Sequence, residues 1–300
     1  IPYLLRLVDF GIDDTSKNII FEHITSFERL SPSASEYNKK RNLIKAIKAL
    51  PFGIQAKTPP TLQEALNDIG PAYEIKGRKR VRTNKGEKMV NYLNSVKTDM
   101  DKLIYGHEET KNHTMRLIAS MMSNGSAKGG HVYGMHGPPG TGKTQFAQMI
   151  AKAFGRPCEK HNLGGASNGD DLVGHGYTYE GSTYGSVARA MMNAGCENPV
   201  IVFDELDKVS KTHKGNEINN ILIHMTDSTQ NTTFQDKYLA GINIDLSKVI
   251  MIFTFNDPSS VSPILLDRMK MIRVGGYKIH GKVVIAKKHI IPTVKKELGY

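Results

Sequence analysis

Residues 137–144 read Gly137-Pro138-Pro139-Gly140-Thr141-Gly142-Lys143-Thr144, a complete G-x-x-x-x-G-K-[S/T] phosphate-binding loop. The glycines allow backbone angles that let successive N–H groups turn inward around a phosphate. Lys143 would place a positive charge near the β- and γ-phosphates, and the hydroxyl of Thr144 would ligate Mg²⁺. We therefore expect this loop to bind a nucleoside triphosphate, ATP, together with Mg²⁺.

The residues on both sides of the loop support this prediction. Residues 131–135, His-Val-Tyr-Gly-Met, read as a short buried strand that leads into it. After the loop, apolar residues recur at helical spacing until Gly155 and Pro157 end the helix. The N-terminus of that helix would point at the phosphates and add a favourable dipole. A chance glycine-rich turn, the alternative, would not need this strand–loop–helix frame.

Apolar runs in the second half predict further strands of a parallel α/β sheet. The runs are residues 200–203, 249–255 and 271–274. Fully buried parallel strands read as continuous apolar runs because helices cover both faces of the sheet. Ligands of such sheets bind beyond the carboxyl ends of the strands. Asp204, Glu205 and Asn256, which follow the first two runs, should therefore lie at the same edge as the phosphate loop.

These polar residues carry the groups that ATP hydrolysis needs. Asp204 is expected to hold Mg²⁺ through its water shell, and Glu205 to orient or deprotonate the attacking water. Asn256 would hydrogen-bond the γ-phosphate or that water, because an amide both donates and accepts. The structural alternative for Asp204 and Glu205 is an acidic pair at a helix N-terminus, and the alternative for Asn256 is an ordinary turn. Arg268 either pairs with Asp267 or reaches the γ-phosphate of a neighbouring subunit as an arginine finger.

The amino-acid composition limits the cellular compartments and the binding partners that can be expected for this chain. The two cysteines, Cys158 and Cys196, lack C-x-x-C spacing and fit a reducing, intracellular compartment, either the cytoplasm or an organelle matrix. No apolar run approaches the ~18 residues needed to span a bilayer, so no membrane partner is expected. The net charge of +11 and the basic run in residues 76–88 leave open DNA binding. That run has no aromatic residues to stack on bases, which favours a solvated loop or hairpin.

Further sequence segments, spread over most of the chain, indicate a narrower protein family. They are residues 28–30, 36–37, 50–53, 162–165, 174–175, 178–182, 198–199, 203–208, 227–231, 234–239 and 265–269. The phosphate loop and the Asp204-Glu205 pair alone would give only an AAA+ ATPase. Taken with the other segments, they make the chain similar to the ATPase module of the Lon protease family.

The resemblance implies an α/β fold, an AAA+ P-loop NTPase with a parallel sheet flanked by helices. Residues 1–54 would form a helical N-terminal segment, 55–100 a basic connecting insertion, 101–275 the ATPase large domain and 276–300 the start of a small helical domain. The chain stops before the family's second sensor arginine and its Ser-Lys peptidase domain. We therefore expect a segment of a longer protein, either a Lon-like protease or a Lon-type ATPase that has lost its peptidase.

The resemblance also implies a homo-oligomeric, hexameric ring that pulls unfolded or tagged protein substrates through a central pore. Tyr179 would sit on the first pore loop and residues 231–234 near a second, although Glu180 departs from the family's aliphatic residue. Tyr105 and Gly106 would belong to the nucleotide site. Two other functions stay open: a DNA-associated AAA+ ATPase, and a structural nucleotide-binding subunit that does not turn over. The complete set of hydrolysis residues argues against the second.

Overall fold

The computed structural model describes residues 11–67, 72–76, 79–123, 131–166, 168–179, 181–210 and 213–299 of the 300-residue chain. The chain divides into two compact units. The first lies within Ile1–Lys57, Ala127–Gly134 and Gly155–Lys270, and the second within Thr58–Ser126, Met135–Phe154 and Met271–Tyr300. A search of the described helices finds none whose length and apolar content would let it span a bilayer.

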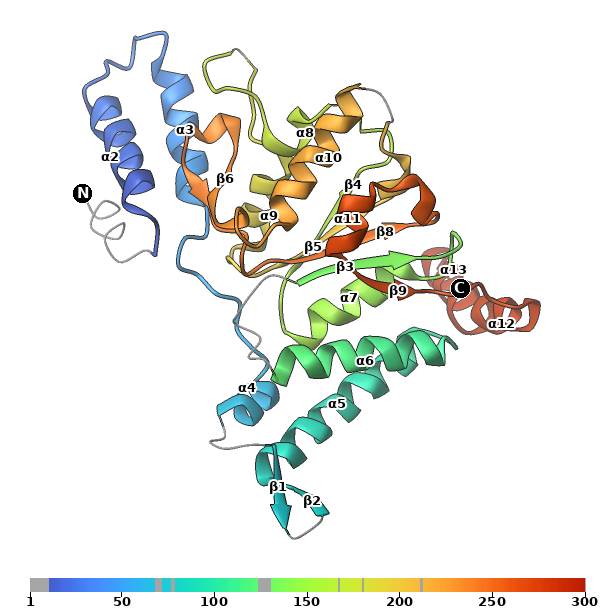
Figure 1. Ribbon diagram of the computed structural model, residues 1–300. Coiled ribbons are helices and arrows are strands. Elements are labelled where there is room, and N and C mark those ends of the chain that lie inside the picture. Colours follow the sequence, from blue (N-terminus) through green and yellow to red (C-terminus); the bar gives the residue numbers. More distant parts are fainter. Residues whose placement is uncertain are drawn as a thin grey trace. The chain divides into compact units, whose positions relative to one another are not determined.

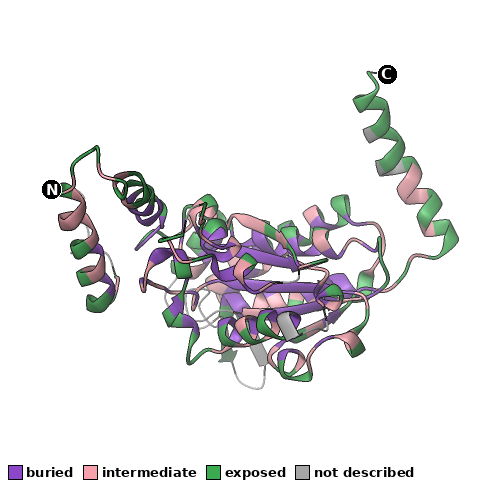
Figure 2. Cartoon of the chain, turned by 90° about the horizontal axis from the view of Figure 1, so that it is seen from above, coloured by how far each residue is buried: buried purple, intermediate pink, exposed green. Residues whose placement is uncertain are grey.

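A five-stranded parallel sheet flanked by helices underlies the fold, which confirms the predicted α/β class (Figure 1). Its strands, in spatial order, are β4 (Cys158–Asn162), β5 (Val200–Asp204), β8 (Ile250–Phe255), β3 (His131–His136) and β9 (Lys270–Arg273). The apolar runs that predicted β5, β8 and β9 are confirmed, and every residue of β8 is buried. Figure 2 shows buried residues, in purple, concentrated in the central strands. Parallel pairing places Phe203 opposite Phe253, and their rings stack with centroids 5.0 Å apart.

Strand β4 has no apolar run and was not predicted. Its sequence, Cys-Glu-Lys-His-Asn, is half-buried or exposed at every position because β4 lies at the edge of the sheet. A strand at an edge is not covered on all sides, so it does not require the continuous apolar run of a central strand. Its pairing with β5 places Lys160 opposite Val202 and Asn162 opposite Asp204. The polar side chains of β4 are thereby brought beside the acidic end of β5.

Two helices precede the sheet in the first unit, as the sequence predicted before residue 50. Helix α2 spans Asp14–Glu28, and α3 spans Tyr37–Ala49. Helix α3 buries one apolar face, which carries Leu43, Ile44 and Ile47. The remaining elements of this unit are α8 (Asp170–Val173), α9 (Ser186–Ala194), α10 (His213–Thr226), α11 (Pro263–Arg268) and the antiparallel hairpin of β6 (Phe234–Gln235) and β7 (Asn243–Ile244).

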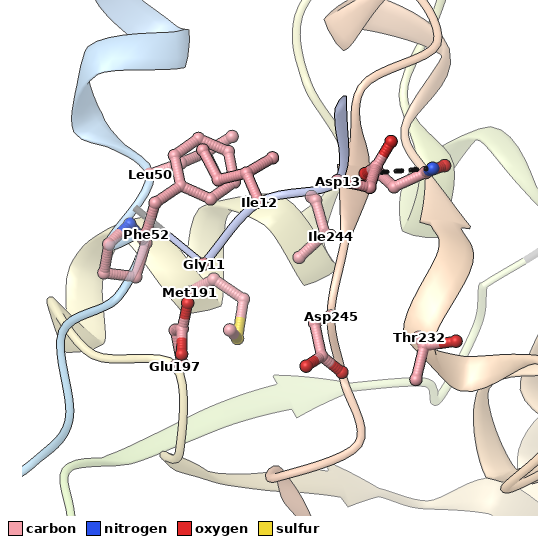
Figure 3. A pocket seen from close by; sticks show the side chains of 12 residues that line it. Gly11, Ile12, Asp13, Leu50, Phe52, Met191, Glu197, Thr232, Ile244 and Asp245 are labelled. Atoms are coloured by element: carbon pink, nitrogen blue, oxygen red, sulfur yellow. Dashed lines mark hydrogen bonds between the residues drawn. The ribbon is translucent and has the colours of Figure 1, made fainter. Parts of the chain in front are cut away.

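Glu197 makes several of the contacts that hold the segment after α3 within the first unit. The N–H of Gly53 donates to Glu197 Oε1 at 2.6 Å, and the amide of Gln55 donates to Glu197 Oε2 at 2.8 Å. The N–H of Glu197 in turn donates to the carbonyl of Ile54 at 2.7 Å. Beside these contacts lies a pocket of about 200 Å³, to which Phe52 contributes its ring (Figure 3). Glu197 therefore fixes the path of the chain out of the N-terminal helices.

The second unit contains the helix after the phosphate loop, α7 (Lys143–Ala153), on which α5 (Asn84–Leu103) and α6 (Glu108–Ser123) pack, together with further helices and a hairpin. These further elements are α4 (Pro60–Asn67), β1 (Tyr73–Lys76), β2 (Lys79–Arg82), α12 (Ile279–Ile285) and α13 (Ile291–Glu297). Lys79–Arg82 of the basic run pair with Tyr73–Lys76 in the antiparallel β1–β2 hairpin, which confirms the predicted hairpin for this part of the run, and residues 84–88 begin α5. Tyr92 on α5 donates its hydroxyl to the carbonyl of Ala153, and Lys152 on α7 pairs with Asp99 at 2.8 Å.

Candidate active site

The phosphate loop connects β3 to α7 in the second unit. Its backbone has left-handed angles at Gly137, with φ of 151°, and at Gly142, with φ of 89°, where it caps α7. A Cβ at Gly137 would lie 1.9 Å from the carbonyl oxygen of Val274, so the close approach of these two segments requires glycine. The strand–loop–helix frame predicted around the motif is confirmed.

Lys143 folds its side chain back into the loop. Its Nζ donates to the carbonyl oxygens of Gly137 at 2.7 Å and Pro138 at 3.0 Å, and only 9% of the residue is exposed. The hydroxyl of Thr141 donates to the same Pro138 carbonyl at 2.9 Å. The half-buried Thr144 follows Lys143 in the first turn of α7. The positive charge is thus held inside the loop at a helix N-terminus, an arrangement that favours a bound anion.

Tyr105 and Gly106 lie in the turn between α5 and α6, and this turn contacts the phosphate loop. A ring hydrogen bond joins the next residue, His107, to the backbone of Thr141. The His107 ring also lies 4.2 Å from the ring of Tyr277, centroid to centroid. Burial lowers the pKa of His107, which keeps the imidazole neutral at pH 7 although the Thr141 hydrogen bond opposes the shift. Neither His107 nor Tyr277 was predicted from the sequence, because no local sequence pattern marks either residue.

Asp204 ends β5 in the first unit with its carboxylate fully engaged. Lys160 on β4 pairs with Oδ2 at 2.6 Å, and the hydroxyl of Thr254 on β8 donates to Oδ1. The N–H of Glu205 also donates to Oδ1, at 3.1 Å. Burial raises the pKa of Asp204, but the Lys160 and Thr254 hydrogen bonds outweigh it and hold the pKa below its ordinary value. The carboxylate is therefore ionised at neutral pH, as a metal ligand must be.

Glu205 adopts a backbone conformation that non-glycine residues rarely take, with φ of 62° and ψ of 42°. Its carboxylate pairs with Lys208 through Oε1. The other oxygen, Oε2, lies over Gly164, where a Cβ would come within 2.0 Å of it. Gly164 itself donates its N–H to the side chain of Asn162 at 2.9 Å. The turn after β4 therefore leaves space for the Glu205 carboxylate only because it carries glycine.

Asn256 follows β8, the strand next to β5 in the sheet. Its N–H and that of Asp257 donate to Asp207 Oδ2 at 3.1 and 3.3 Å. Asp207 belongs to the short 3₁₀ turn after Glu205, so it ties the end of β8 to the end of β5. The sequence analysis missed Asp207, Lys160 and Thr254. The strand order places β3, which leads into the phosphate loop, on the other side of β8.

Tyr179 and Arg268 occupy different environments in the first unit. Tyr179 is 72% exposed on the loop that follows α8. Arg268, at the end of α11, pairs through Nη2 with Asp227 at 3.0 Å and donates through Nη1 to the carbonyl of Ile223 on α10. The sequence alternative of an ion pair with Asp267 named the wrong partner, because the last turn of α11 directs the guanidinium toward α10 rather than along its own helix.

Comparison with known proteins identifies relatives of this arrangement. Residues 133–277 match the family described as the ATPase family associated with various cellular activities (AAA). A Lon protease homolog of Acanthamoeba polyphaga mimivirus is 41% identical over 218 residues, which cover 72% of this chain and 21% of the relative. The mitochondrial Lon protease homolog of Schizosaccharomyces pombe is 31% identical over 295 residues, 98% of this chain and 24% of the relative.

A bacterial relative gives a similar comparison. Lon protease 1 of Syntrophotalea carbinolica is 31% identical over 297 residues, 99% of this chain and 32% of the relative. The chain thus spans between 21% and 32% of the length of these three proteins. The similarity extends over nearly the whole chain in two of them, so it includes the helices before the AAA match as well as the sheet.

Proposed function

Because the chain belongs to the AAA ATPase family, as the ATPase module of the Lon proteases, we propose that it hydrolyses ATP to unfold and translocate protein substrates within a Lon-like protease. The observation that carries this proposal is the phosphate loop with the Lys143 ammonium held inside it, combined with an ionised Asp204 and an adjacent Glu205 at a strand end. Members of this family are ATP-hydrolysing enzymes. The action on protein substrates rests on the kinship with Lon.

Each residue of the proposed site has a distinct task in hydrolysis. The loop amides and Lys143 bind the β- and γ-phosphates, and Thr144 and Asp204 would hold Mg²⁺. When bound, Mg²⁺ neutralises charge on the phosphate oxygens. Glu205 orients the attacking water and accepts its proton, while Asn256 contacts the γ-phosphate or that water. The residues present fit the metal, because a hydroxyl and an ionised carboxylate are oxygen ligands of the kind that Mg²⁺ prefers.

Replacing Lys143 with alanine should weaken ATP binding by about tenfold or more, because a charge-assisted hydrogen bond to a phosphate is lost. Titration with a fluorescent ATP analogue measures the effect. Lys152→Ala is the matched control, since Lys152 lies on the same helix but pairs with Asp99 on the protein surface. Equal affinities of the Lys143 variant and the unmodified protein would contradict the assignment of the loop.

Tyr179 is the proposed contact with the substrate. It is exposed, and an aromatic ring can press on a polypeptide without reading its sequence. Tyr179→Ala should keep basal ATP hydrolysis and lose ATP-dependent unfolding of a tagged substrate in the full-length protein. Tyr179→Phe, which keeps the ring, should retain unfolding. Normal unfolding by the alanine variant would mean that Tyr179 is an ordinary loop residue.

A DNA-associated ATPase remains the second candidate, favoured by one observation. The basic run of residues 76–88 contributes the exposed Arg82 at the end of β2 and Lys85 in the first turn of α5. Positive side chains of this kind bind phosphate backbones in a salt-dependent way. Stimulation of the ATPase by unfolded protein supports the unfolding function, whereas stimulation by DNA that disappears with rising salt supports this alternative.

A further inference from the structure

The loop that carries Tyr179 is closed at its base by two buried glycines. Gly174 and Gly185 flank it, and a Cβ at Gly174 would lie 2.7 Å from the nitrogen of Gly185. A Cβ at Gly185 would lie 2.1 Å from the carbonyl oxygen of Leu172. The described residues in the middle of the loop are largely exposed. The loop is therefore a projecting segment whose two ends meet, and its direction depends on what holds that base.

One carboxylate holds the base of this loop to the β6–β7 hairpin. Asp236, which follows β6, is 0% exposed and accepts the N–H of Gly185 on Oδ2 at 2.7 Å. Its other oxygen, Oδ1, accepts the N–H of Tyr238 at 2.9 Å and lies 2.9 Å from the position of a Cβ on Gly174. A single side chain thus contacts both ends of the loop and the turn that follows β6.

The chemistry of this contact suits an aspartate and not its neutral analogues. Both oxygens of a carboxylate accept hydrogen bonds, whereas an asparagine must direct an N–H₂ group at one of the two amides. A buried carboxylate is costly, and charge-assisted hydrogen bonds to amides offset part of that cost. Burial raises the pKa of Asp236 to about 6, although its backbone hydrogen bonds oppose the shift.

The charged and titratable groups around Asp236 lie on several neighbouring elements. They are the ion pair of Lys237 with Asp170 at 2.6 Å, His175 at 3.5 Å from Asp170, Arg189, which lies over the Tyr184 ring, and Tyr238. Neither the ion pair nor the ring contact involves Asp236, whose pKa is set by burial and by hydrogen bonds from backbone N–H groups. The backbone amides are therefore the partners that the Asp236 carboxylate would lose on protonation.

The hairpin that Asp236 fixes is also connected to the central sheet, because it leads directly into the first residues of β8. Strand β7 leads into β8, and the N–H of Leu246 between them donates to the carbonyl of Asn231 before β6 at 2.8 Å. Asn256, the proposed contact with the γ-phosphate or the attacking water, follows the opposite end of β8 from the hairpin. A change at that end of β8 can reach the loop only through segments that are packed or hydrogen-bonded to it.

We propose that Asp236 is a positioning residue for substrate translocation, which locks the base of the Tyr179 loop to the β6–β7 hairpin so that the loop moves with the ATPase sheet. This inference rests on the proposed role of Tyr179 in gripping substrate. It assigns Asp236 no contact with substrate or nucleotide. Its loss should uncouple ATP hydrolysis from unfolding, and it should not abolish hydrolysis.

The test compares Asp236→Asn with Asp170→Asn in the full-length protein. Asp170→Asn breaks the nearby ion pair with Lys237, so it is a control for an Asp-to-Asn change at the same place. Asp236→Asn should lower the amount of tagged substrate unfolded per ATP hydrolysed by about tenfold at saturating substrate, with basal ATPase nearly unchanged. Asp170→Asn should change this ratio little, because its ion pair is partly solvated. A parallel loss of thermal stability, basal ATPase and unfolding in Asp236→Asn would overturn the proposal.

The dependence on pH provides a second measurement, in which the decisive result comes from the unmodified protein. Protonation of Asp236 removes an acceptor, so unfolding per ATP by the unmodified protein should fall as the pH is lowered from about 7.5 to about 6. Asp236→Asn should give a flat, low ratio over this range. A ratio independent of pH in the unmodified protein would overturn the proposal. If the Tyr179→Ala variant unfolds substrate normally, the proposed role of the Tyr179 loop is wrong. If Tyr179→Ala loses substrate unfolding but Asp236→Asn retains it, only the inference about Asp236 is wrong.

Discussion

Replacing Glu205 with glutamine should leave ATP binding intact and lower hydrolysis by about 10²- to 10⁴-fold, the usual contribution of a general base. The amide has the same size as the carboxylate and cannot accept the proton of the attacking water. The structure adds a reason for a large effect: Glu205 keeps its strained φ of 62° at the end of β5, where an ordinary surface glutamate would not need it. Steady-state hydrolysis and binding of a fluorescent ATP analogue measure the two quantities separately.

Two further variants test whether hydrolysis depends on the position of the Glu205 carboxylate as well as on its presence. Gly164→Ala places a methyl group 2.0 Å from Oε2, so the carboxylate must move while it stays in the protein. We expect a loss of hydrolysis smaller than that of Glu205→Gln. Lys208→Ala removes the ion pair with Glu205 and should not slow hydrolysis, if that pair only holds the side chain at rest. Near-normal hydrolysis by Glu205→Gln would contradict the assignment.

The central part of the fold could be predicted because buried strands require apolar residues at consecutive positions of the sequence. Strands β5 and β8 are covered on both faces, so nearly all their positions are apolar and the runs are visible. The phosphate loop is visible for a different reason, since its glycines and Lys143 are required by backbone geometry and charge. Edge strand β4 could not be predicted because its residues are half-buried or exposed and therefore do not form an apolar run. Its polar residues also gave no periodic pattern.

The contacts that position the site could not be predicted, because they join residues far apart in the chain. Asp236 meets Gly185 across 51 positions, and Arg268 meets Asp227 across 41. Asp207 bonds the backbone of Asn256 across 49 positions. An aspartate in a short polar segment reads as a turn residue whether it bonds its neighbour or a distant amide. The sequence predicted the residues that are proposed to contact ATP. The side chains that hold those residues in place could be found only in the structure.

Replacing Arg268 with alanine should lower ATP turnover by about 10³- to 10⁵-fold while ATP binding is little changed, the range expected of an arginine finger. A finger acts on the γ-phosphate of a neighbouring subunit, so this prediction includes the proposed homo-oligomeric ring. Specific ATPase activity should accordingly rise with protein concentration as rings assemble. The structure offers a competing role, because the Arg268 guanidinium already bonds Asp227 and the carbonyl of Ile223 within its own subunit.

The two roles of Arg268 are separated by changing its partner. Asp227→Asn removes the ion pair and leaves the guanidinium in place. If Arg268 only holds α11 against α10, both variants should show a similar drop in melting temperature and a similar loss of activity, because each removes the same ion pair. If Arg268 is a finger, Asp227→Asn should share the loss of stability and retain most of the turnover. Thermal melts and steady-state ATPase rates of the two variants measure these effects.

Mixing two inactive proteins tests whether Arg268 acts across a subunit boundary. Arg268→Ala lacks the finger but has an intact Glu205, and Glu205→Gln lacks the base but has an intact Arg268. In mixed rings, a site with an intact Glu205 can receive Arg268 from a neighbouring Glu205→Gln subunit, so part of the activity should return. The activity should peak at intermediate mixing ratios, because such sites need one subunit of each kind. If mixed rings form, as shown by co-purification of differently tagged subunits, and no activity returns, Arg268 acts within its own subunit through Asp227.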